Sequence, residues 1–377
     1  FFFQQQGLED KSPTEDEWAH LTRGILYWQT GDTRMSFAHP PLANAVAALP
    51  VAFDPDNPDL TKSRHWKSAR VGMVALRWLE KDYDTPRAHL IQARRMMVIF
   101  LLAFILYAFF FTTRFFGPGA GAIVTLLIAF HPTLLAQARY VTTDFPAALG
   151  ALVAAGEFTR YLSSKKLYPL FTMIGAVSFA VLCKHSLVVI VVFMILIGLA
   201  AAALGLGRFS ERRPATRMGL ALGHILLTAL LVGVSINAAY RFQDTGMTVQ
   251  EILDKPEPNG AISRISKHRV FERYTPLPDW PPGLRVPLPY TYVYGLATMR
   301  GFNDRGYSSW FWGHTQRKGS VWYFPALTVL KSPLVWLLGL LLALAALFRK
   351  RVPDPASAAF GLIGLGFLAV AMNASLN

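Results

Sequence analysis

The chain has 377 residues, of which 53% are hydrophobic and 16% are charged, and its formal net charge is +14 at pH 7. Apolar residues fall in blocks of roughly twenty, about the length that a helix needs to cross a bilayer. This pattern excludes an ordinary soluble protein and predicts an all-α, multi-pass membrane protein. The single cysteine, Cys183, excludes a disulfide within the chain and a cysteine-rich metal site.

Residues 1–95 precede the first clear span and contain two amphipathic stretches, at 17–30 and 63–82. Apolar and aromatic residues such as Trp18 and Leu21 recur there at helical spacing, and the second stretch is also rich in basic residues. Helices of this kind tend to lie in the membrane interface. The chain begins on three phenylalanines, Phe1 to Phe3, which we interpret as the end of a preceding span that is missing from the sequence.

Residues 96–240 contain six predicted spans, which together form a transmembrane core. The spans cover 96–116, 119–137, 143–162, 168–184, 186–207 and 218–240. A loop rich in proline and aromatic residues follows at 241–323, and its composition suits an ordered, irregular cover over a site. Residues 324–377 hold two further predicted spans, 324–348 and 357–377, and we expect this C-terminal part to be truncated.

Basic residues in the short connections determine the predicted orientation, because Lys and Arg concentrate on the cytoplasmic side. One set of connections is rich in them, whereas the opposite set holds only Arg139 and Lys184. The rich set is therefore predicted to be cytoplasmic, and the two long loops to lie outside a plasma (inner) membrane. This bias, together with contact to anionic membrane lipids, explains the basic charge without a nucleic-acid partner. The rich set comprises Arg114, Arg160, Lys165, Lys166, Arg208, Arg212, Arg213, Arg217, Arg349, Lys350 and Arg351.

Ionisable residues beside the predicted spans are the candidates for chemistry. Asp16 and His20 are four residues apart, so they share one face of a helix, and a carboxylate there can act as a general base. Asp16 and Glu17 can equally be explained as acids that cap the start of a helix. His39 stands before a double proline where the chain enters an apolar segment, a suitable level for contact with a lipid phosphate.

Further candidates stand at the outer ends of later spans. Asp144 is the only acid in its short turn, and ionisable groups at membrane depth tend to be functional, although an N-cap role is compatible with the same position. Lys184 and Lys331 can neutralise a phosphate or simply extend to the membrane surface. Aspartates at 54, 56 and 59 look faintly like a metal loop, but the prolines between them favour turns, and no metal or other cofactor is indicated.

Taken in order, these motifs resemble the protein O-mannosyltransferase and aminoarabinose transferase group of GT-C glycosyltransferases, which use polyprenyl-phosphate-linked sugars as donors. The resemblance covers nearly the whole chain and implies a GT-C-like transmembrane helix bundle with long extracytoplasmic loops that carry interfacial helices. It rests on Asp16-Glu17, on His39-Pro40-Pro41-Leu42, on the segment from Ala138 to Asp144, on Lys184, and on the block from Gly313 through Trp322-Tyr323-Phe324-Pro325 to Lys331-Ser332-Pro333-Leu334.

The resemblance also implies roles for the candidate residues. Asp16 and Asp144 would be catalytic. The donor phosphate would be bound by His39, which replaces a lysine of the aminoarabinose type, with Lys184 and Lys331. Residues that bind or position the acceptor would be Glu17, His20, Arg139 and Tyr323.

The implied reaction is an inverting sugar transfer from a polyprenyl-phosphate donor on the extracytoplasmic side. The acceptor stays open between a protein Ser or Thr, a lipid and a glycan, because specificity resides in loop shape. Two alternatives also stay open. One is a non-catalytic GT-C-like subunit of a larger membrane assembly, and the other is a multi-pass lipid or solute transporter.

Overall fold

The structure, a computed structural model, describes residues 7–9, 11–257, 270–306, 308–316, 319–348 and 355–374. This part of the chain is mainly helical, and its only sheet is a hairpin of β1 (Ser309–Phe311) and β2 (His314–Gln316). Two predictions lie outside the described residues: the missing span inferred from Phe1 to Phe3, and the basic connection at 349–351.

Three helical segments in the described part are long and apolar enough to cross a membrane. They are α5 (Asp84–Phe116), His185–Phe209, and α11 (Pro214–Ala239). The second segment consists of η3 (His185–Leu187), α10 (Val188–Leu204) and η4 (Gly207–Phe209). Shorter apolar helices are α6 (Pro118–Ala129), α9 (Tyr168–Cys183) and most of α17 (Pro355–Met372). The chain is therefore an all-α protein in its described part, with helices suited to a membrane.

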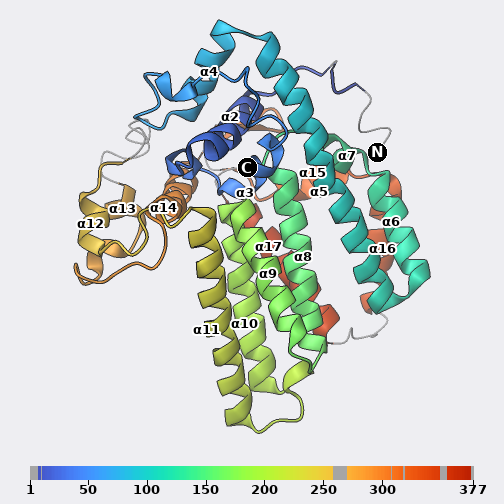
Figure 1. Ribbon diagram of the computed structural model, residues 1–377. Helices are drawn as coiled ribbons and strands as arrows, with labels where there is room; N and C mark the ends of the chain where they lie inside the picture. Colours follow the sequence, from blue (N-terminus) through green and yellow to red (C-terminus); the bar gives the residue numbers. More distant parts are fainter. Residues whose placement is uncertain are drawn as a thin grey trace.

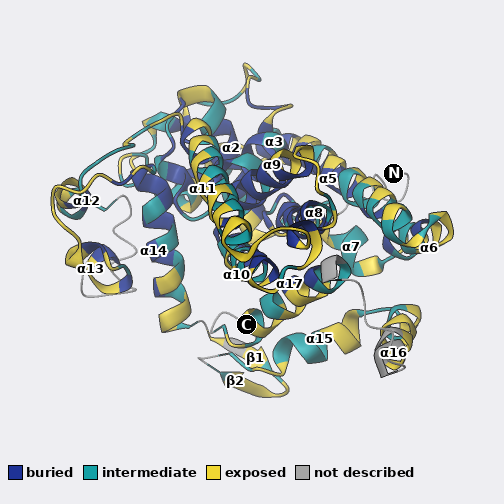
Figure 2. Ribbon diagram, turned by 90° about the horizontal axis from the view of Figure 1, so that it is seen from below, coloured by how far each residue is buried: buried dark blue, intermediate teal, exposed yellow. Residues whose placement is uncertain are grey.

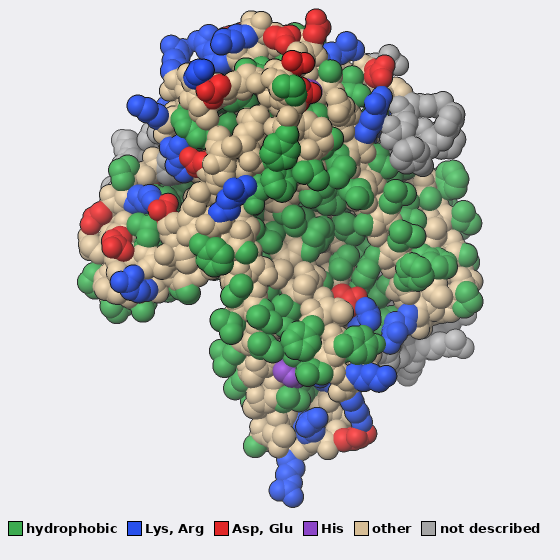
Figure 3. Space-filling view, in the orientation of Figure 1, with side chains coloured by type: hydrophobic (Ala, Val, Ile, Leu, Met, Phe, Trp, Pro, Cys, Tyr) green, Lys and Arg blue, Asp and Glu red, His purple; other side chains and the backbone are tan. Residues whose placement is uncertain are grey.

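Hydrophobic side chains cover the middle of the face in Figure 3, and charged side chains gather in its upper part and around its lower end. Large apolar residues are exposed on the candidate spans, among them Phe110 at 65% and Leu226 at 71%. Exposed apolar bands of this kind fit contact with lipid rather than with water.

Two predicted spans are wrong as continuous helices. The stretch 119–137 is broken into α6 and α7 (Pro132–Gln137), and the stretch 324–348 into α15 (Tyr323–Lys331) and α16 (Leu334–Phe348), which bend by 117°. Proline causes both breaks, because it cannot donate a hydrogen bond and it pushes the preceding residue out of the helical region. His131 before Pro132 and Ser332 before Pro333 accordingly have extended backbones.

The first long segment forms three helices, which lie over one end of the apolar helices. These are α2 (Glu15–Thr30), α3 (Pro41–Ala48) and α4 (Val71–Lys81), and in Figure 1 α2 and α3 lie over the upper ends of α8 (Asp144–Ser163) and α9. Two short 3₁₀ turns, η1 (Arg34–Ser36) and η2 (Leu60–Lys62), connect them. The amphipathic stretch 17–30 is thus confirmed as a helix, whereas the helix predicted at 63–82 begins only at Val71.

The apolar face of α2 packs against other helices. Its apolar residues Leu21, Ile25 and Leu26 are fully buried, and they pack in a core cluster with Ala48 of α3 and Val74 of α4. Neighbouring helices cover the apolar face of α2, which is therefore not available to lipid. Figure 2 shows that burial is densest where α2, α3, α8 and α9 meet, while α6 and α16 are more exposed.

The second long segment is more regular than its prolines predict. It contains α12 (Val249–Asp254), α13 (Val270–Tyr274), η6 (Leu277–Asp279) and the 16-residue helix α14 (Tyr290–Arg305). The prolines end at Pro289, which stands at the N-cap of α14, and from there to Arg305 no proline interrupts the helix. The rings of Phe271 and Tyr294 lie tilted to each other with centroids 5.6 Å apart, in a small core that also includes Phe37 of the first long segment.

Candidate functional site

Ionisable side chains gather where the first long segment meets the ends of α8 and α9. Asp16 and His20 come from α2, His39 precedes α3, Asp144 opens α8, and Lys184 follows α9. Lys184 Nζ donates a hydrogen bond to Asp144 Oδ1 at 2.5 Å, and the two side chains are 27% and 61% exposed. The pair is therefore within reach of a ligand, and we call these five residues the outer cluster.

Two histidines form the inner wall of the outer cluster. The rings of His20 and His39 lie with their centroids 5.0 Å apart. His20 Nδ1 is 2.8 Å from Asn44 Oδ1, and His39 Nδ1 is 3.3 Å from Thr143 Oγ1, next to Asp144. These contacts join α2, α3 and the start of α8 at a single point.

The electrostatic environment keeps both histidines neutral at neutral pH. Burial, helped by the positive charge of Arg23, lowers the pKa of His20 to about 3. The pKa of His39 also falls well below its usual value, chiefly through burial and then through Arg23. Arg23 is itself buried, and this lowers its pKa to about 10, so that it stays charged. His39 can therefore offer a ligand a hydrogen bond from a neutral ring, rather than the positive charge expected of a phosphate-binding cation.

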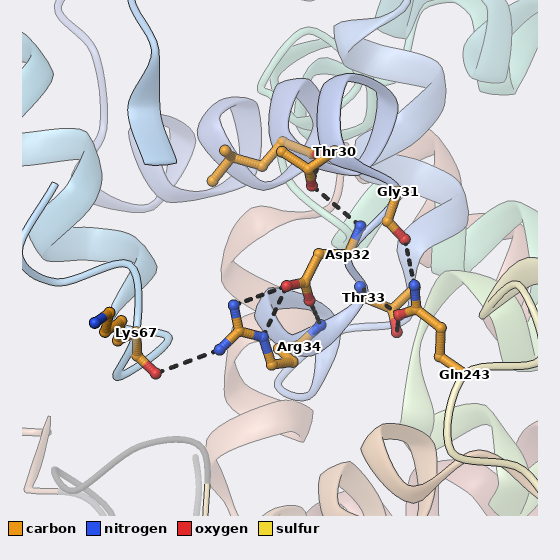
Figure 4. Close-up of polar contacts among 8 residues, drawn as sticks. Thr30, Gly31, Asp32, Thr33, Arg34, Lys67 and Gln243 are labelled. Atoms are coloured by element: carbon orange, nitrogen blue, oxygen red, sulfur yellow. Dashed lines mark hydrogen bonds and ion pairs between the residues drawn. The ribbon is translucent and has the colours of Figure 1, made fainter. Parts of the chain in front are cut away.

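The turn between α2 and η1 sets the position of the chain before His39 (Figure 4). Gln243, which follows α11, accepts hydrogen bonds at Oε1 from the Thr33 amide and hydroxyl, at 3.0 and 2.7 Å, and donates from Nε2 to the Gly31 carbonyl at 2.8 Å. Gly31 has φ +71°, the left-handed conformation that glycine adopts most easily. Arg34 reaches the Lys67 carbonyl on the other side of the turn, at 3.4 Å. The turn is thus tied to two distant parts of the chain.

Helix α14 also holds the chain just before His39 in place. His185 Nε2 donates to the Phe37 carbonyl at 3.0 Å, and its ring lies 4.9 Å from that of Tyr292. A Cβ at Gly295 would lie only 2.1 Å from the Phe37 carbonyl oxygen and 2.4 Å from His185 Nε2. Only glycine allows α14 to approach this closely, so the helix covers the chain just before His39.

Three predicted acceptor or positioning residues lie in different surroundings. Glu17 is fully buried and paired with Arg94 of α5, so it faces away from any ligand. Arg139 is half-buried, and its Nε has no hydrogen-bond partner among the described residues. Tyr323 opens α15, where it packs edge to face on Phe311.

Lys331 also lies apart from the outer cluster within the described structure. Its backbone carbonyl accepts a hydrogen bond from Thr133 Oγ1 at 3.1 Å, so the α15–α16 bend is joined to the α6–α7 break. Trp336 strengthens this junction, because its Nε1 donates to the Leu127 carbonyl at 3.2 Å and its ring contacts His131. The exposed side chain of Lys331 forms no hydrogen bond or ion pair with the cluster in the residues that the structure describes.

Sequence reasoning missed Arg23 and Asn44, and it considered His185 only together with Lys184, as a possible partner of a phosphate. Arg23 is seven residues after Asp16 on the same face of α2, a spacing that could have revealed it. Asn44 carried no comparable signal, because it reads as an ordinary residue within a short apolar helix.

No group of three or more His, Cys, Asp or Glu in the described ranges is placed to hold a metal ion. Comparison with protein-family models, with curated proteins and with solved structures found no match. The function of the chain must therefore be inferred from the residues of the outer cluster and from the helices that hold them.

Proposed function

We propose that the chain is an integral-membrane glycosyltransferase with GT-C-like architecture, which moves a sugar from a polyprenyl-phosphate donor to an acceptor. The reaction would take place on the extracytoplasmic face of the plasma (inner) membrane, where the long segments are predicted to lie. The proposal is supported chiefly by the accessible Lys184–Asp144 pair beside His39, at the ends of apolar helices.

The donor phosphate would take the place of Asp144 on Lys184. A lysine ammonium forms short, strong hydrogen bonds with phosphate oxygens, and His39 would add a bond from its neutral ring. Displacement frees the Asp144 carboxylate to position the acceptor. Lys331 would join this site only through movement of the bent α15–α16 pair, so we assign it a supporting role in holding the donor.

Asp16 is the proposed general base. It lies on the exposed side of α2, one turn before His20, and its charge acts on Arg23. The acceptor oxygen would bond to the anomeric carbon while the bond from that carbon to the phosphate oxygen breaks. The electron pair of the broken bond leaves with polyprenyl phosphate, and the acceptor proton passes to Asp16, so the configuration is inverted.

Transfer of radiolabelled sugar from polyprenyl phosphate in membranes tests the proposal. Asp16→Asn should lower the rate about 10²- to 10⁴-fold, the usual contribution of a general base. Asp56→Asn is the matched control, because Asp56 is an exposed acid of the same long segment, away from the cluster. Full activity in Asp16→Asn would remove this residue from the mechanism. Absence of transfer in the unaltered protein with every such donor would favour the non-catalytic subunit or the transporter.

A further inference from the structure

A groove of about 730 Å³ adjoins the outer cluster, between α2, α4 and α14. Ala19 and Ala38 line the groove and are the chain neighbours of His20 and His39. Arg23 also lines the groove, and its Nη1 lies 3.2 Å from His20 Nδ1. A molecule in the groove would therefore touch the residues that hold the cluster.

The charges on the groove wall are mainly positive. Arg23, Arg70 and Arg305 line it, opposed by the carboxylate of Glu15. Arg23 is only 4% exposed, and its Nε is occupied by the Met35 carbonyl at 2.8 Å. Its Nη2 makes no hydrogen bond within the described part of the chain. An anion in the groove would accept a charge-assisted hydrogen bond from this N–H.

The start of α4 adds to this positive potential. Residues 69–73 line the groove, and α4 begins at Val71 after Arg70 with no side-chain cap and no acidic residue in its first turn. Amide groups at a helix start carry a partial positive charge and favour anions. Arg70 Nε is also buried, with no hydrogen-bond partner in the described residues.

Apolar side chains occupy the remainder of the wall. Trp18 projects from α2, Leu76 and Leu79 from α4, and Phe302 from α14. A ligand that fits this lining carries an apolar part beside its anionic group, since a small hydrated anion would leave these side chains uncovered.

We propose that the groove binds the acceptor through an anionic group, a phosphate or a carboxylate, carried next to an apolar portion. The identification of the ligand as the acceptor rests on the proposed function, whereas the anion site follows from the lining of the groove alone. The groove would hold the molecule by its anionic group, while a separate hydroxyl of the same molecule would reach Asp16. Arg23 joins the two regions, because it lines the groove and also contacts His20.

Calorimetric titration of phenyl phosphate into the purified full chain in zwitterionic lipid nanodiscs tests the site directly. We expect Arg70→Gln to weaken binding about tenfold, the scale of one charge-assisted hydrogen bond. Arg77→Gln is its control, because Arg77 lies on the same helix, outside the groove lining, and pairs with Glu80. Equal losses in the two variants would overturn the site.

Gly72 allows a second test that does not depend on removing an arginine. A Cβ at Gly72 meets nothing within 4 Å, and an acid in the first turn of a helix stabilises the fold. Gly72→Glu should therefore fold normally yet weaken phenyl phosphate binding about tenfold, whereas Gly72→Gln, of the same shape, should change it less than about twofold. Unchanged binding in Gly72→Glu would contradict the proposal.

The choice of probe separates the two parts of the ligand. If benzyl alcohol binds as tightly as phenyl phosphate, the proposed requirement for an anionic group is wrong. If inorganic phosphate binds as tightly, the proposed requirement for an apolar portion is wrong. Benzoate tests whether a carboxylate suffices. Binding that depends on Arg70 in a protein that transfers no sugar would refute the proposed function alone, whereas transfer without such binding would refute the groove alone.

Discussion

Glu17 and Arg94 form a two-point ion pair that is shielded from solvent. Arg94 Nε donates to Glu17 Oε1 at 2.8 Å and Nη2 donates to Oε2 at 2.6 Å, while both side chains are at most 2% exposed. The same carboxylate accepts hydrogen bonds from the Thr14 and Val141 amides, at 2.9 and 3.0 Å. One acid thus joins the start of α2, helix α5 and the turn before Asp144, and it fixes the spacing between Asp16 and Asp144.

Removing the arginine should destabilise the whole upper part of the protein. Arg94→Leu leaves the Glu17 charge buried without a partner, which typically costs about 3–5 kcal/mol. Thermal unfolding of the purified protein in detergent would show this as a large drop in the midpoint temperature. Arg95→Leu is the matched control, because Arg95 pairs with Glu9 at the surface and such pairs contribute about 0–1 kcal/mol. Similar losses in both variants would show that the buried pair has no special role.

Acid should destabilise the protein through His20. The folded-state pKa of His20 is about 3, against 6.5 for the exposed ring, so the unfolded chain binds more protons between these values. Stability is therefore fully present above pH 6.5 and falls with decreasing pH, by about 1.4 kcal/mol per pH unit for this residue. His20→Gln should reduce the slope of unfolding free energy against pH between 6.5 and 4.5. An unchanged slope in His20→Gln would contradict the prediction.

Local patterns in the sequence predicted the helices better than they predicted which helices contact one another. The apolar periodicity at 17–30 is found in α2, because it describes one face of one helix. Hydropathy over 119–137 and 324–348 concealed breaks at Pro132 and Pro333, since an average over a span gives little weight to a single proline.

Such local patterns could not reveal contacts between residues that are far apart in the sequence. The structure brings His39, Asp144 and Lys184 together from segments far apart in the chain. Arg94 stands 77 residues from Glu17 and reads, in sequence, as one of several basic residues before a span. Only packing of α5 against α2 distinguishes it from Arg95, its neighbour at the surface.

The close approach of α14 to the outer cluster leads to a last prediction, at Gly295. Gly295→Ala would place a methyl group inside the contact distance of the Phe37 carbonyl and His185, so α14 or the chain before His39 must move. Overpacking of this kind costs about 1–3 kcal/mol. We expect a lower unfolding midpoint and faster hydrogen exchange around residues 35–39. Gly283→Ala in the same long segment is the control, because a Cβ there meets nothing within 4 Å. If the two alanine variants exchange and unfold alike, α14 does not hold His39 in place.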